Sequence, residues 1–242
     1  MEKIFDVAAL GEAMVEFNQT RPGEPNYLQG FGGDTSNAVI AAARAGAKTT
    51  YLTRLGQDKF GDLLTSLWQA ECVDTSGVER DAHAPTGIYF VTHGANGHEF
   101  SYLRAGSAAS RMRPEWLPRA VVRQSKILHV SGISLAISAT ARETAFDAMA
   151  QAREAGTLVS FDSNLRLKLW PIDEARAAIT RAIGLCDLFL PSVDDVNVLS
   201  GLSDADAILD WSHSLGAKQV VLKLGSAGAM LSDTSAGSPH RE

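Results

Sequence analysis

Short apolar runs that alternate with segments of helical periodicity are the feature of this chain that most restricts its fold. The runs cover residues 4–10, 49–55, 127–130, 158–161, 188–190 and 220–224. The segments with apolar residues at helical spacing cover 60–70, 138–155, 172–184 and 204–214. Neighbouring parallel strands need such helical crossovers, and a parallel sheet is buried on both faces. The pattern predicts an α/β fold whose central sheet is mostly parallel, with helices on both faces.

One region departs from this alternation and has the pattern of a hairpin. Residues 86–92 and 98–104 are strand-like, and the glycine-rich stretch 93–97 joins them. Such a turn between two strands predicts a β-hairpin, and another extended piece at Tyr27 and Leu28 could pair with it. We expect these strands to form a small β-strand lid over the mouth of the main sheet. The lid strands are expected at about 12–30 and 85–105, inserted into one domain that spans 1–242.

The second strand of this hairpin carries an aromatic and basic face. Phe100, Tyr102 and Arg104 share one side of it by the two-residue alternation of a strand. An arginine and a tyrosine that point the same way suit an anionic, hydroxylated ligand. A solvated edge strand without a ligand is the alternative explanation of the same pattern.

A glycine pair precedes an alanine-rich, apolar helix in residues 32–46. Gly32 and Gly33 let the backbone come close to a ligand with no Cβ in the way, and residues 34–36 are types that cap helix N-termini. Gly46 stands where a glycine commonly ends a helix. The turn would face the positive end of a helix dipole, which favours an anionic ligand. A tight turn without a ligand is the alternative.

Polar residues follow the apolar run at 158–161. Asp162, Asn164 and Arg166 would face one way if the strand continued briefly, and they offer a carboxylate, an amide and a guanidinium. Ligands of open α/β sheets bind beyond the carboxyl ends of the strands, and an arginine there suits a carboxylate or a phosphate. A structural ion pair between Asp162 and Arg166 is the alternative.

Two further strand ends carry small and polar residues. Ser192 suits a helix N-cap, with acidic residues at 194–195 in the first turn. Capping alone explains these residues, and a water-mediated magnesium or phosphate contact is the functional alternative. The small-residue turn 225–228 follows Lys223, and its backbone N–H groups could meet nucleotide phosphates. The chain lacks the G-x-x-x-x-G-K-[ST] loop and a G-x-G-x-x-G after its first strand, which counts against P-loop enzymes and Rossmann dehydrogenases.

The composition excludes several kinds of partner. The 242 residues carry a net charge of −6, which argues against nucleic acid or an anionic membrane. No apolar run approaches the roughly 20 residues of a transmembrane helix, and the acidic N-terminus does not suit a signal peptide. Cys72 and Cys186 are expected to be buried or half-buried free thiols of a cytoplasmic protein. The six histidines show no triad or metal-ligand spacing, so no metal site is assigned.

Taken in order along the chain, these motifs resemble those of the ribokinase-like (PfkB) carbohydrate kinases. The first signature of that family matches residues 32–37 together with Gly46 and Gly56. Other features fall in family order: Gly11-Glu12, Gly87, the Pro191-Ser192 turn and the Lys223-x-Gly225 turn. Within the family the chain is most similar to the 2-keto-3-deoxygluconate kinases. The matching pieces are residues 32–37, 102–110 and Asp162-x-Asn164-x-Arg166-x-x-Leu169-Trp170.

This resemblance implies a ribokinase-like fold and ATP-dependent phosphate transfer to the terminal hydroxyl of 2-keto-3-deoxygluconate. The implied cofactors are ATP and Mg²⁺, and a homo-oligomer is expected. The residues implied to hold the sugar acid are Gly33, Asn37, Tyr89, Tyr102, Arg104 and Arg166. The residues implied around the nucleotide are Asn164, Ser192, Lys223, Gly225, Ser226 and Gly228. Arginines would neutralise the substrate carboxylate, tyrosines would bond its hydroxyls, and the lid would exclude water.

One family element is not found in residues 1–242. Family members carry a second signature, Asp-Thr-x-Gly-Ala-Gly-Asp, which stabilises the transferred phosphoryl group and supplies the base for the attacking hydroxyl. Residues 233–242 begin with Asp-Thr but lack Gly-Ala-Gly-Asp, so the catalytic base is unknown. Asp233 is expected to be a turn residue. A shortened chain with impaired turnover is therefore expected.

Two alternative functions stay open at this point. The chain could be a non-catalytic sugar-acid-binding protein that keeps the lid and loses turnover. It could also be a kinase for a related sugar such as fructose or ribose. Arg104 and Arg166 argue against a neutral sugar, because two buried guanidinium groups need anionic partners.

Overall fold

A computed structural model describes residues 2–94, 97–234 and 240–241 of the chain. The strands of its main sheet are β1 (Phe5–Leu10), β4 (Thr49–Gly56), β5 (Val73–Asp74), β6 (Val78–Asp81), β9 (Ser125–Ser131), β10 (Leu158–Asp162), β11 (Leu188–Leu190), β12 (Gln219–Lys223), β13 (Ala229–Asp233) and β14 (His240–Arg241). They are ordered β14-β13-β12-β11-β10-β9-β1-β4-β5, and β6 also pairs with β4. The pairings from β5 to β12 are parallel, and β13 and β14 are antiparallel additions at one edge. The prediction of a mostly parallel sheet is confirmed.

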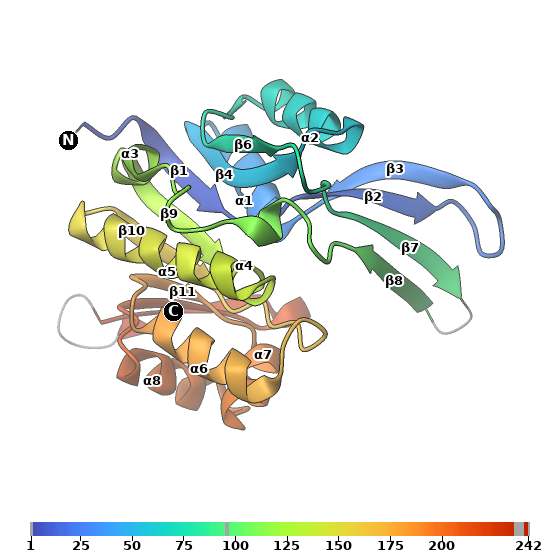
Figure 1. Ribbon diagram of the computed structural model, residues 1–242. Coiled ribbons are helices and arrows are strands. Elements are labelled where there is room, and N and C mark those ends of the chain that lie inside the picture. Colours follow the sequence, from blue (N-terminus) through green and yellow to red (C-terminus); the bar gives the residue numbers. More distant parts are fainter. Residues whose placement is uncertain (1, 95–96, 235–239, 242) are drawn as a thin grey trace.

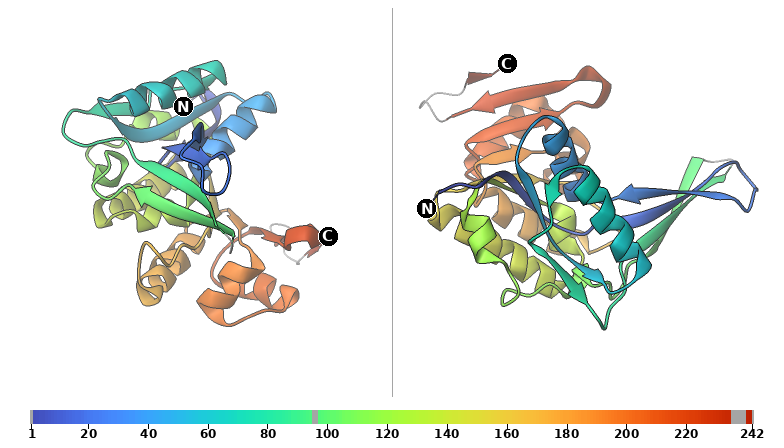
Figure 2. Two further views of the ribbon diagram at one scale, coloured as in Figure 1. Left: turned by 90° about the vertical axis from the view of Figure 1, so that its right-hand side faces the viewer. Right: turned by 90° about the horizontal axis from the view of Figure 1, so that it is seen from above.

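Helices lie on both faces of this sheet, as predicted (Figures 1 and 2). They are α1 (Asp34–Arg44), α2 (Lys59–Ala70), α3 (Arg119–Arg123), α4 (Gly132–Ala136), α5 (Ala139–Glu154), α6 (Ile172–Ile183), α7 (Val193–Ser200) and α8 (Ala205–Ser214), with 3₁₀ turns at Ala109–Arg111 and Gly225–Ala227. Ala9 of β1 packs in the core under α1 and α2, whereas Ala8 packs in the core on the opposite face. Neighbouring residues of one strand thus serve two layers, as a strand buried on both faces requires. Within the described ranges, no helix is both long enough and apolar enough to cross a membrane.

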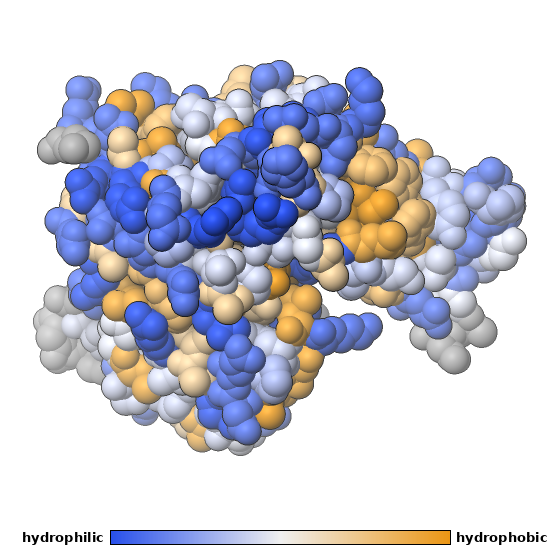
Figure 3. Space-filling model, viewed as in Figure 1, coloured by the Kyte–Doolittle hydropathy of each residue, from blue (hydrophilic) through white to orange (hydrophobic). Residues whose placement is uncertain are grey.

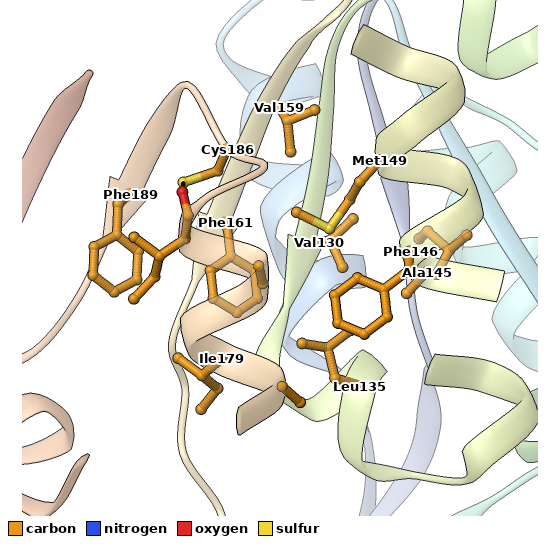
Figure 4. Packing of buried hydrophobic residues seen from close by; sticks show 14 of the residues in the cluster. Val130, Leu135, Ala145, Phe146, Met149, Val159, Phe161, Ile179, Cys186 and Phe189 are labelled. Carbon is orange, nitrogen blue, oxygen red and sulfur yellow. Dashed lines mark hydrogen bonds between the residues drawn. The ribbon is translucent and has the colours of Figure 1, made fainter. Parts of the chain in front are cut away.

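The larger of the two cores is built around stacked aromatic rings. Phe161 of β10 and Phe189 of β11 are fully buried, and their ring centroids are 6.0 Å apart. Figure 4 shows Val130 and Met149 beyond Phe161, so that side chains of strands and helices interdigitate. Truncating a buried phenylalanine in such a core typically costs about 3–5 kcal/mol. This core fixes the strands whose carboxyl ends carry the predicted polar residues.

The two cysteines have different surroundings. Cys186 lies in this core, where its thiol donates to the Ile183 carbonyl at 3.3 Å (Figure 4). Burial raises the pKa of the Cys186 thiol to about 12. Both cysteines are free, but Cys72 is exposed, so its predicted burial is wrong. Cys72 follows the last turn of α2 with a φ of 59°, in the turn that leads to β5.

Coverage of the face that carries Ala9 is uneven. The pairing registers of β9, β10 and β11 place Leu158 on this same face, and Leu231 follows on it through β12 and β13. Leu158 is 54% exposed and Leu231 is 36% exposed. Helices α1 and α2 bury the Ala9 side of this face, while its opposite end carries these exposed leucines.

A second sheet projects from the body as the predicted lid (Figures 1 and 2). Its strands are β2 (Met14–Gln19), β3 (Tyr27–Gly32), β7 (Ile88–Gly94) and β8 (Gly97–Leu103), in the order β3-β2-β7-β8. Strands β7 and β8 form the predicted hairpin, and the extended piece at Tyr27 joins it through β2. Both hairpin strands extend into the stretch 93–97 assigned to the turn, of which residues 95–96 lie outside the described residues. Arg104 follows the end of β8 instead of lying on it.

Aromatic side chains join the lid to the body. Phe17 of β2 meets Phe60 of α2 edge to face at 6.0 Å, and it stacks on Phe90 of β7 at 5.2 Å. Figure 3 shows hydrophobic side chains gathered where the lid meets the body. Aromatic pairs contribute about 0.5–1.5 kcal/mol beyond the burial of their area. The base of the lid is therefore anchored by packing, while its far end projects into solvent.

The turn before α1 depends on a glycine at position 33. Gly33 is the N-cap with a φ of 124°, and a Cβ there would lie 2.6 Å from the carbonyl oxygen of Glu12. Only glycine fits this conformation and this space. Residues 34–36, predicted as capping types, lie inside the first turn of the helix, and no side chain caps it. Gly46 follows the helix with a φ of 93°, as a helix-ending glycine should.

Candidate functional site

A cavity of about 600 Å³ lies between the lid, the start of α1 and the loop after β10. All six residues implied for sugar binding line it: Gly33, Asn37, Tyr89, Tyr102, Arg104 and Arg166. We call these six residues the sugar wall. The other lining residues are Glu12, Met14, Asp34, Phe100, Ala105, Ile133, Asn164, Lys168 and Leu169. The fold therefore gathers at one place residues that are widely separated in the sequence.

The lid contributes two stacked tyrosines to the sugar wall. Tyr89 of β7 and Tyr102 of β8 lie directly opposite each other, with ring centroids 5.5 Å apart. The Tyr89 hydroxyl donates to the Glu16 carboxylate, and burial together with Glu16 raises the pKa of Tyr89. Tyr102 is 44% exposed, so its hydroxyl is accessible to a ligand. The Tyr89 hydroxyl is occupied by Glu16, so Tyr89 contributes the surface of its ring to the cavity. Tyr102 can offer both its ring and its hydroxyl to a hydroxylated molecule.

Arg104 reaches the cavity as one half of a buried ion pair. Its guanidinium contacts the carboxylate of Glu12, whose side chain is 1% exposed. The hydroxyl of Ser107 donates to the same carboxylate at 2.5 Å. Burial raises the pKa of Glu12, while Arg104 and Ser107 act against that rise. The charge of Arg104 is thus balanced before any ligand binds, which the alternation along the hairpin did not predict.

The loop after β10 does not continue the strand, so the predicted alternation of Asp162, Asn164 and Arg166 is wrong. Strand β10 ends at Asp162, and Asn164 has a φ of 28°, which turns the chain. The amide of Asn164 donates to Asp34 Oδ2 at 2.7 Å, and its backbone N–H donates to Asp162 Oδ1 at 3.1 Å. These bonds tie the loop to the first turn of α1. The helix dipole there favours the negative charge of Asp34.

Arg166 and Lys168 are exposed cations of the same loop, so the expectation of a buried Arg166 guanidinium is wrong. Arg166 Nη1 donates to the carbonyl of Leu165 at 2.8 Å. Across residues 2–94, 97–234 and 240–241, neither cation forms an ion pair, and Asp162 pairs with Lys223 instead of Arg166. The alternative of an Asp162–Arg166 ion pair is therefore wrong. The cavity has one cation that is already balanced and two that are not.

The residues implied for the nucleotide lie along the neighbouring strand ends. We call Asn164, Ser192, Lys223, Gly225, Ser226 and Gly228 the nucleotide edge. Ser192 caps α7, since its hydroxyl accepts the Asp195 N–H at 3.1 Å, which confirms the predicted cap. Ser192 also forms a β-bridge with Lys223, whose amine donates to both oxygens of Asp162 at 2.7 and 2.9 Å. Asn164 lines the cavity as well, so the nucleotide edge and the sugar wall adjoin at this residue.

The glycines of the nucleotide edge shape an exposed turn between β12 and β13. Gly225 has a φ of 60° and Gly228 a φ of 98°, and both are exposed together with Ser226. The N–H of Leu224 donates to the carbonyl of Gly228 at 2.8 Å, which closes the turn. A turn of this kind presents backbone and hydroxyl donors to a ligand at the strand ends.

Asp233 lies at the opposite end of the sheet from the nucleotide edge. It is the last residue of β13, so its predicted place in a turn is wrong. Strand β13 is antiparallel to β12, with Asp233 opposite Gln219 and Ala229 opposite Lys223. Gln219 donates to the Asp233 carboxylate at 2.7 Å. At about 3.4 Å per residue the two strand ends are roughly 14 Å apart. Asp233 is therefore too distant to act as a base at the nucleotide edge.

Four polar or aromatic cavity residues were not assigned as site residues from the sequence: Glu12, Asp34, Phe100 and Lys168. Each lies inside a motif that the sequence singles out, so a signal was present. Phe100 alternates with Tyr102 along β8, and Lys168 follows Arg166 by two residues. Their contribution to the cavity depends on how the lid and the loop after β10 meet, which periodicity cannot show.

Comparisons with known proteins show the family and the fold of this chain. The family described as "pfkB family carbohydrate kinase" matches residues 5–242. A 2-dehydro-3-deoxygluconokinase of Thermoproteus tenax is 33% identical over 237 residues, which are 94% of this chain and 72% of that protein. A probable fructokinase-2 of Arabidopsis thaliana is 33% identical over 232 residues, 92% of this chain and 70% of that protein. The crystal structure of a fructokinase with bound ATP from Xylella fastidiosa superposes with a TM-score of 0.87 at 28% identity, covering 99% of this chain and 74% of that one. The ribokinase-like fold is confirmed, and the chain belongs to the pfkB family of carbohydrate kinases.

Proposed function

We propose that this carbohydrate kinase uses ATP to phosphorylate 2-keto-3-deoxygluconate (2-dehydro-3-deoxy-D-gluconate) to its 6-phosphate. The observation that carries the proposal is the charge of the cavity. Arg166 and Lys168 are exposed and have no anionic partner among the described residues. Cations gathered in a cavity favour an anionic ligand, and a guanidinium suits a carboxylate in particular. A sugar acid supplies that charge, and a neutral hexose does not.

The carboxylate would lie against the loop after β10. Arg166 offers a planar guanidinium there, and Lys168 adds a second positive charge from the same loop. Arg104 lines the cavity too, but Glu12 already balances its charge. We therefore assign the main carboxylate contact to Arg166 and a supporting contact to Arg104. A charge-assisted hydrogen bond of this kind contributes about 1.5–3 kcal/mol.

The hydroxyl groups of the substrate would lie toward the lid and α1. Tyr102 presents an accessible hydroxyl, and Asn37 lies exposed on α1 at the same cavity. Asp34 offers a carboxylate that accepts from Asn164 on its other side. Gly33 lets the backbone come close, because it has no Cβ. Donors and acceptors thus line the cavity along the lid and the first turns of α1.

ATP would bind along the nucleotide edge, next to the substrate hydroxyl. Ser192, Ser226 and the glycine turn offer hydroxyl and backbone donors, and Lys223 offers a cation. This donor set suits the phosphates of a nucleotide. The carboxylate of Asp162 lies beside it, bonded to Lys223, and the carboxylate of Asp195 accepts from the Ser163 hydroxyl at 2.6 Å in the loop after β10. Carboxylate oxygens suit Mg²⁺, which prefers oxygen ligands. When bound with ATP, Mg²⁺ neutralises charge on the phosphates during transfer.

The lid would close over the bound sugar acid. It projects from the body and carries Tyr89 and Tyr102 on the side that lines the cavity. Closure of such an element excludes water from the reacting phosphate and completes the site. Phe17 and Phe60 anchor the base of the lid, so we expect its far end to move most.

A kinase for a neutral sugar such as fructose is the second candidate. It is favoured by the similarity to the Arabidopsis thaliana protein described as a probable fructokinase, which matches the similarity to the Thermoproteus tenax protein in identity. A non-catalytic sugar-acid-binding protein is the third. Arg166 and Lys168, the cations of the cavity that are unpaired among the described residues, favour a sugar acid over a neutral sugar. They therefore separate the proposed sugar-acid kinase from a fructokinase.

Product analysis tests the proposed reaction. The protein would be incubated for hours with Mg²⁺, ATP and one sugar at a time, at protein concentrations close to that of the sugar. Mass spectrometry of the sugar then detects a gain of one phosphoryl group even when turnover is slow. We expect 2-keto-3-deoxygluconate to be phosphorylated ahead of fructose, ribose and gluconate. Faster phosphorylation of fructose would overturn the assignment, and no product with any sugar would favour the binding protein.

We also propose that the protein forms a homo-oligomer through its lid. Exposed apolar residues on the two faces of the lid support this: Leu28 at 70% and Phe100 at 47% exposure on the face that lines the cavity, and Leu103 at 58% on the other face. Apolar groups gathered on one element favour association. Light scattering after size exclusion would give the mass in solution, and replacing Leu28 and Leu103 by serine should shift it toward that of one chain. A mass of one chain for the unaltered protein would contradict the proposal.

We further propose a cytoplasmic location. The free thiols of Cys72 and Cys186 support it, because unpaired cysteines are typical of reducing compartments. Fractionation of cells that express the chain, with detection by antibody, tests the location. Recovery in a secreted or membrane fraction would contradict it.

A further inference from the structure

Two histidines face each other on the lid hairpin. His93 of β7 and His98 of β8 are directly opposite in the pairing register. Their Nδ1 atoms are 2.7 Å apart, and the rings meet edge to face with centroids 4.6 Å apart. His98 is exposed and His93 is half-buried. Four residues separate the two in sequence, so the hairpin register, and not their spacing, brings the two nitrogens together.

The protonation of His93 follows from its hydrogen bonds. Asn18 Nδ2 donates to the Glu16 carboxylate at 3.2 Å, and a carboxylate only accepts, so the amide oxygen of Asn18 must face the other way. That oxygen lies 2.9 Å from His93 Nε2 and accepts its proton. A neutral His93 therefore has an unprotonated Nδ1, which accepts from His98 Nδ1. The backbone N–H of His93 donates to Gln19 Oε1 at 3.0 Å and fixes the residue further.

We propose that His93 and His98 form a binding site for a borderline divalent cation, with Zn²⁺ as the ion to test. The cation would bind between the two Nδ1 atoms in place of the shared proton. His98 would then carry its proton on Nε2, which faces solvent, so both rings stay neutral. Water would complete the coordination. Imidazole nitrogens suit Zn²⁺, Cu²⁺ and Ni²⁺, whereas Mg²⁺ prefers oxygen ligands.

The present geometry needs only a small adjustment to accept such an ion. Zn–N bonds of 2.0–2.1 Å in a tetrahedral site place two nitrogens about 3.3 Å apart. The two Nδ1 atoms, now 2.7 Å apart, would separate by roughly half an ångström. The exposed ring of His98 can move that far by a side-chain rotation. Asn18 acts as the outer partner that orients His93, an arrangement typical of metal-bound histidines.

The site would connect the two strands of the lid near their far ends. Along β7 and β8, His93 and His98 alternate in phase with Tyr89 and Tyr102, so they lie on the side of the hairpin that lines the cavity. A bound cation would hold the strands together beyond the stacked tyrosines. The lid would then be stiffer with the cation than without it.

Titration of zinc chloride tests the proposal. Because the exposed thiol of Cys72 could also bind Zn²⁺, the parent protein is Cys72→Ser. By calorimetry at pH 7.5, we expect one site in this parent, weakened at least tenfold by His93→Ala and by His98→Ala. His83→Ala, an exposed histidine outside the hairpin, is the matched control and should not change the affinity. Magnesium chloride should give no binding at this site.

Asn18 provides a second and independent comparison. Asn18→Ala removes the oxygen that orients His93, and loss of such an outer partner typically weakens metal binding about 10- to 100-fold. Asn18→Asp keeps an acceptor oxygen and should keep the affinity. If Zn²⁺ bound two exposed imidazoles without help from Asn18, Asn18→Ala and Asn18→Asp would have the same zinc affinity. In the parent, Zn²⁺ should shift the ring NMR signals of His93 and His98.

Two results would overturn the proposal. One is an unchanged zinc affinity in His93→Ala and His98→Ala, since the ion would then bind elsewhere. The other is an absence of both binding heat and histidine ring shifts in the parent at millimolar zinc. Thermal melts of every variant establish that each one is folded under the conditions of titration.

Discussion

The sugar wall and the nucleotide edge differ in how far their charges are balanced within the protein. On the sugar wall, Arg166 is exposed and bonds only the carbonyl of Leu165 among the described residues. On the nucleotide edge, Lys223 already holds both oxygens of Asp162. The first region can attract an anion at once, whereas at the second a phosphate must compete with Asp162 or bind beside it. We infer that the sugar wall is arranged to bind an anion without rearrangement, whereas the nucleotide edge must first release Lys223 from Asp162 or bind the phosphate beside this pair.

The largest expected effect is a loss of turnover with sugar-acid binding retained, which would separate the function of the sugar wall from that of the nucleotide edge. A polypeptide of residues 1–242 alone has the whole sugar wall but no Gly-Ala-Gly-Asp sequence. Loss of a general base typically lowers the reaction rate about 10²–10⁴-fold. Loss of anion-stabilising donors typically lowers it a further 10²–10³-fold or so, as an order of magnitude. We expect sugar-acid binding with turnover at least about 10⁴-fold below the roughly 1–100 per second of kinases. ADP release would be measured with and without an appended family-type segment, and full activity without it would contradict the expectation.

The next effect concerns the buried ion pair behind the sugar wall. Arg104→Ala leaves the carboxylate of Glu12 buried without its partner, which typically costs about 3–5 kcal/mol of stability. Because burial raises the pKa of Glu12 in the folded chain, stability from this group is present at low pH and is lost as the pH rises through that pKa. The variant should therefore lose more stability at pH 8 than at pH 5.

Urea denaturation at the two pH values measures this loss. Arg113→Ala, on an exposed arginine outside the cavity, is the control and should stay within about 0.5 kcal/mol of the parent. A loss for Arg104→Ala that is equal at both pH values would show that Glu12 does not carry the effect.

A smaller effect is expected from the free cation of the sugar wall. Arg166→Ala should weaken binding of 2-keto-3-deoxygluconate by about 1.5–3 kcal/mol, roughly 10- to 150-fold. Binding of ATP should hardly change, because Arg166 lies in the sugar cavity and not among the residues of the nucleotide edge. Calorimetric titration of both ligands into the parent and the variant gives the two affinities. An unchanged affinity for the sugar acid would remove Arg166 from the site.

The smallest effect is expected on the nucleotide edge. Lys223→Ala removes a cation that is 44% exposed and paired with Asp162, so the free energy of unfolding should change by less than about 1 kcal/mol. ATP affinity should fall by about tenfold, since one charge-assisted contact is lost while a repulsive carboxylate becomes free. Sugar-acid affinity should stay the same. If the sugar acid weakens as much as ATP, the two regions are not separate.

The sequence predicted the main sheet and the second sheet for physical reasons. The six residues of the sugar wall came from the family resemblance; they line one cavity, and their role in sugar binding stays a prediction. Buried parallel strands need largely apolar runs, such as 127–130 and 158–161 with one polar residue each, and these are visible without a structure. The hairpin was visible because its strands flank a glycine-rich stretch. The sequence singles out position 33 because a glycine pair precedes an apolar helix. The φ of 124° at Gly33 explains why a glycine is needed there.

What the sequence could not predict depends on contacts between distant residues. The pairing of Glu12 with Arg104 joins the end of β1 to the end of β8, and no periodicity links them. The bond from Asn164 to Asp34 likewise depends on the turn at Asn164, whose φ of 28° breaks the expected alternation. Asp233 lies in β13, an antiparallel addition at the edge of the sheet that the alternation of strands and helices does not predict.

The affinities of 2-keto-3-deoxygluconate and fructose for the unaltered protein test the central claim most directly, because they do not depend on turnover. Both ligands would be titrated calorimetrically under the same conditions, with no nucleotide present. If the free charge of Arg166 selects a sugar acid, 2-keto-3-deoxygluconate should bind at least about tenfold more tightly than fructose. Equal affinities, or tighter binding of fructose, would contradict the account.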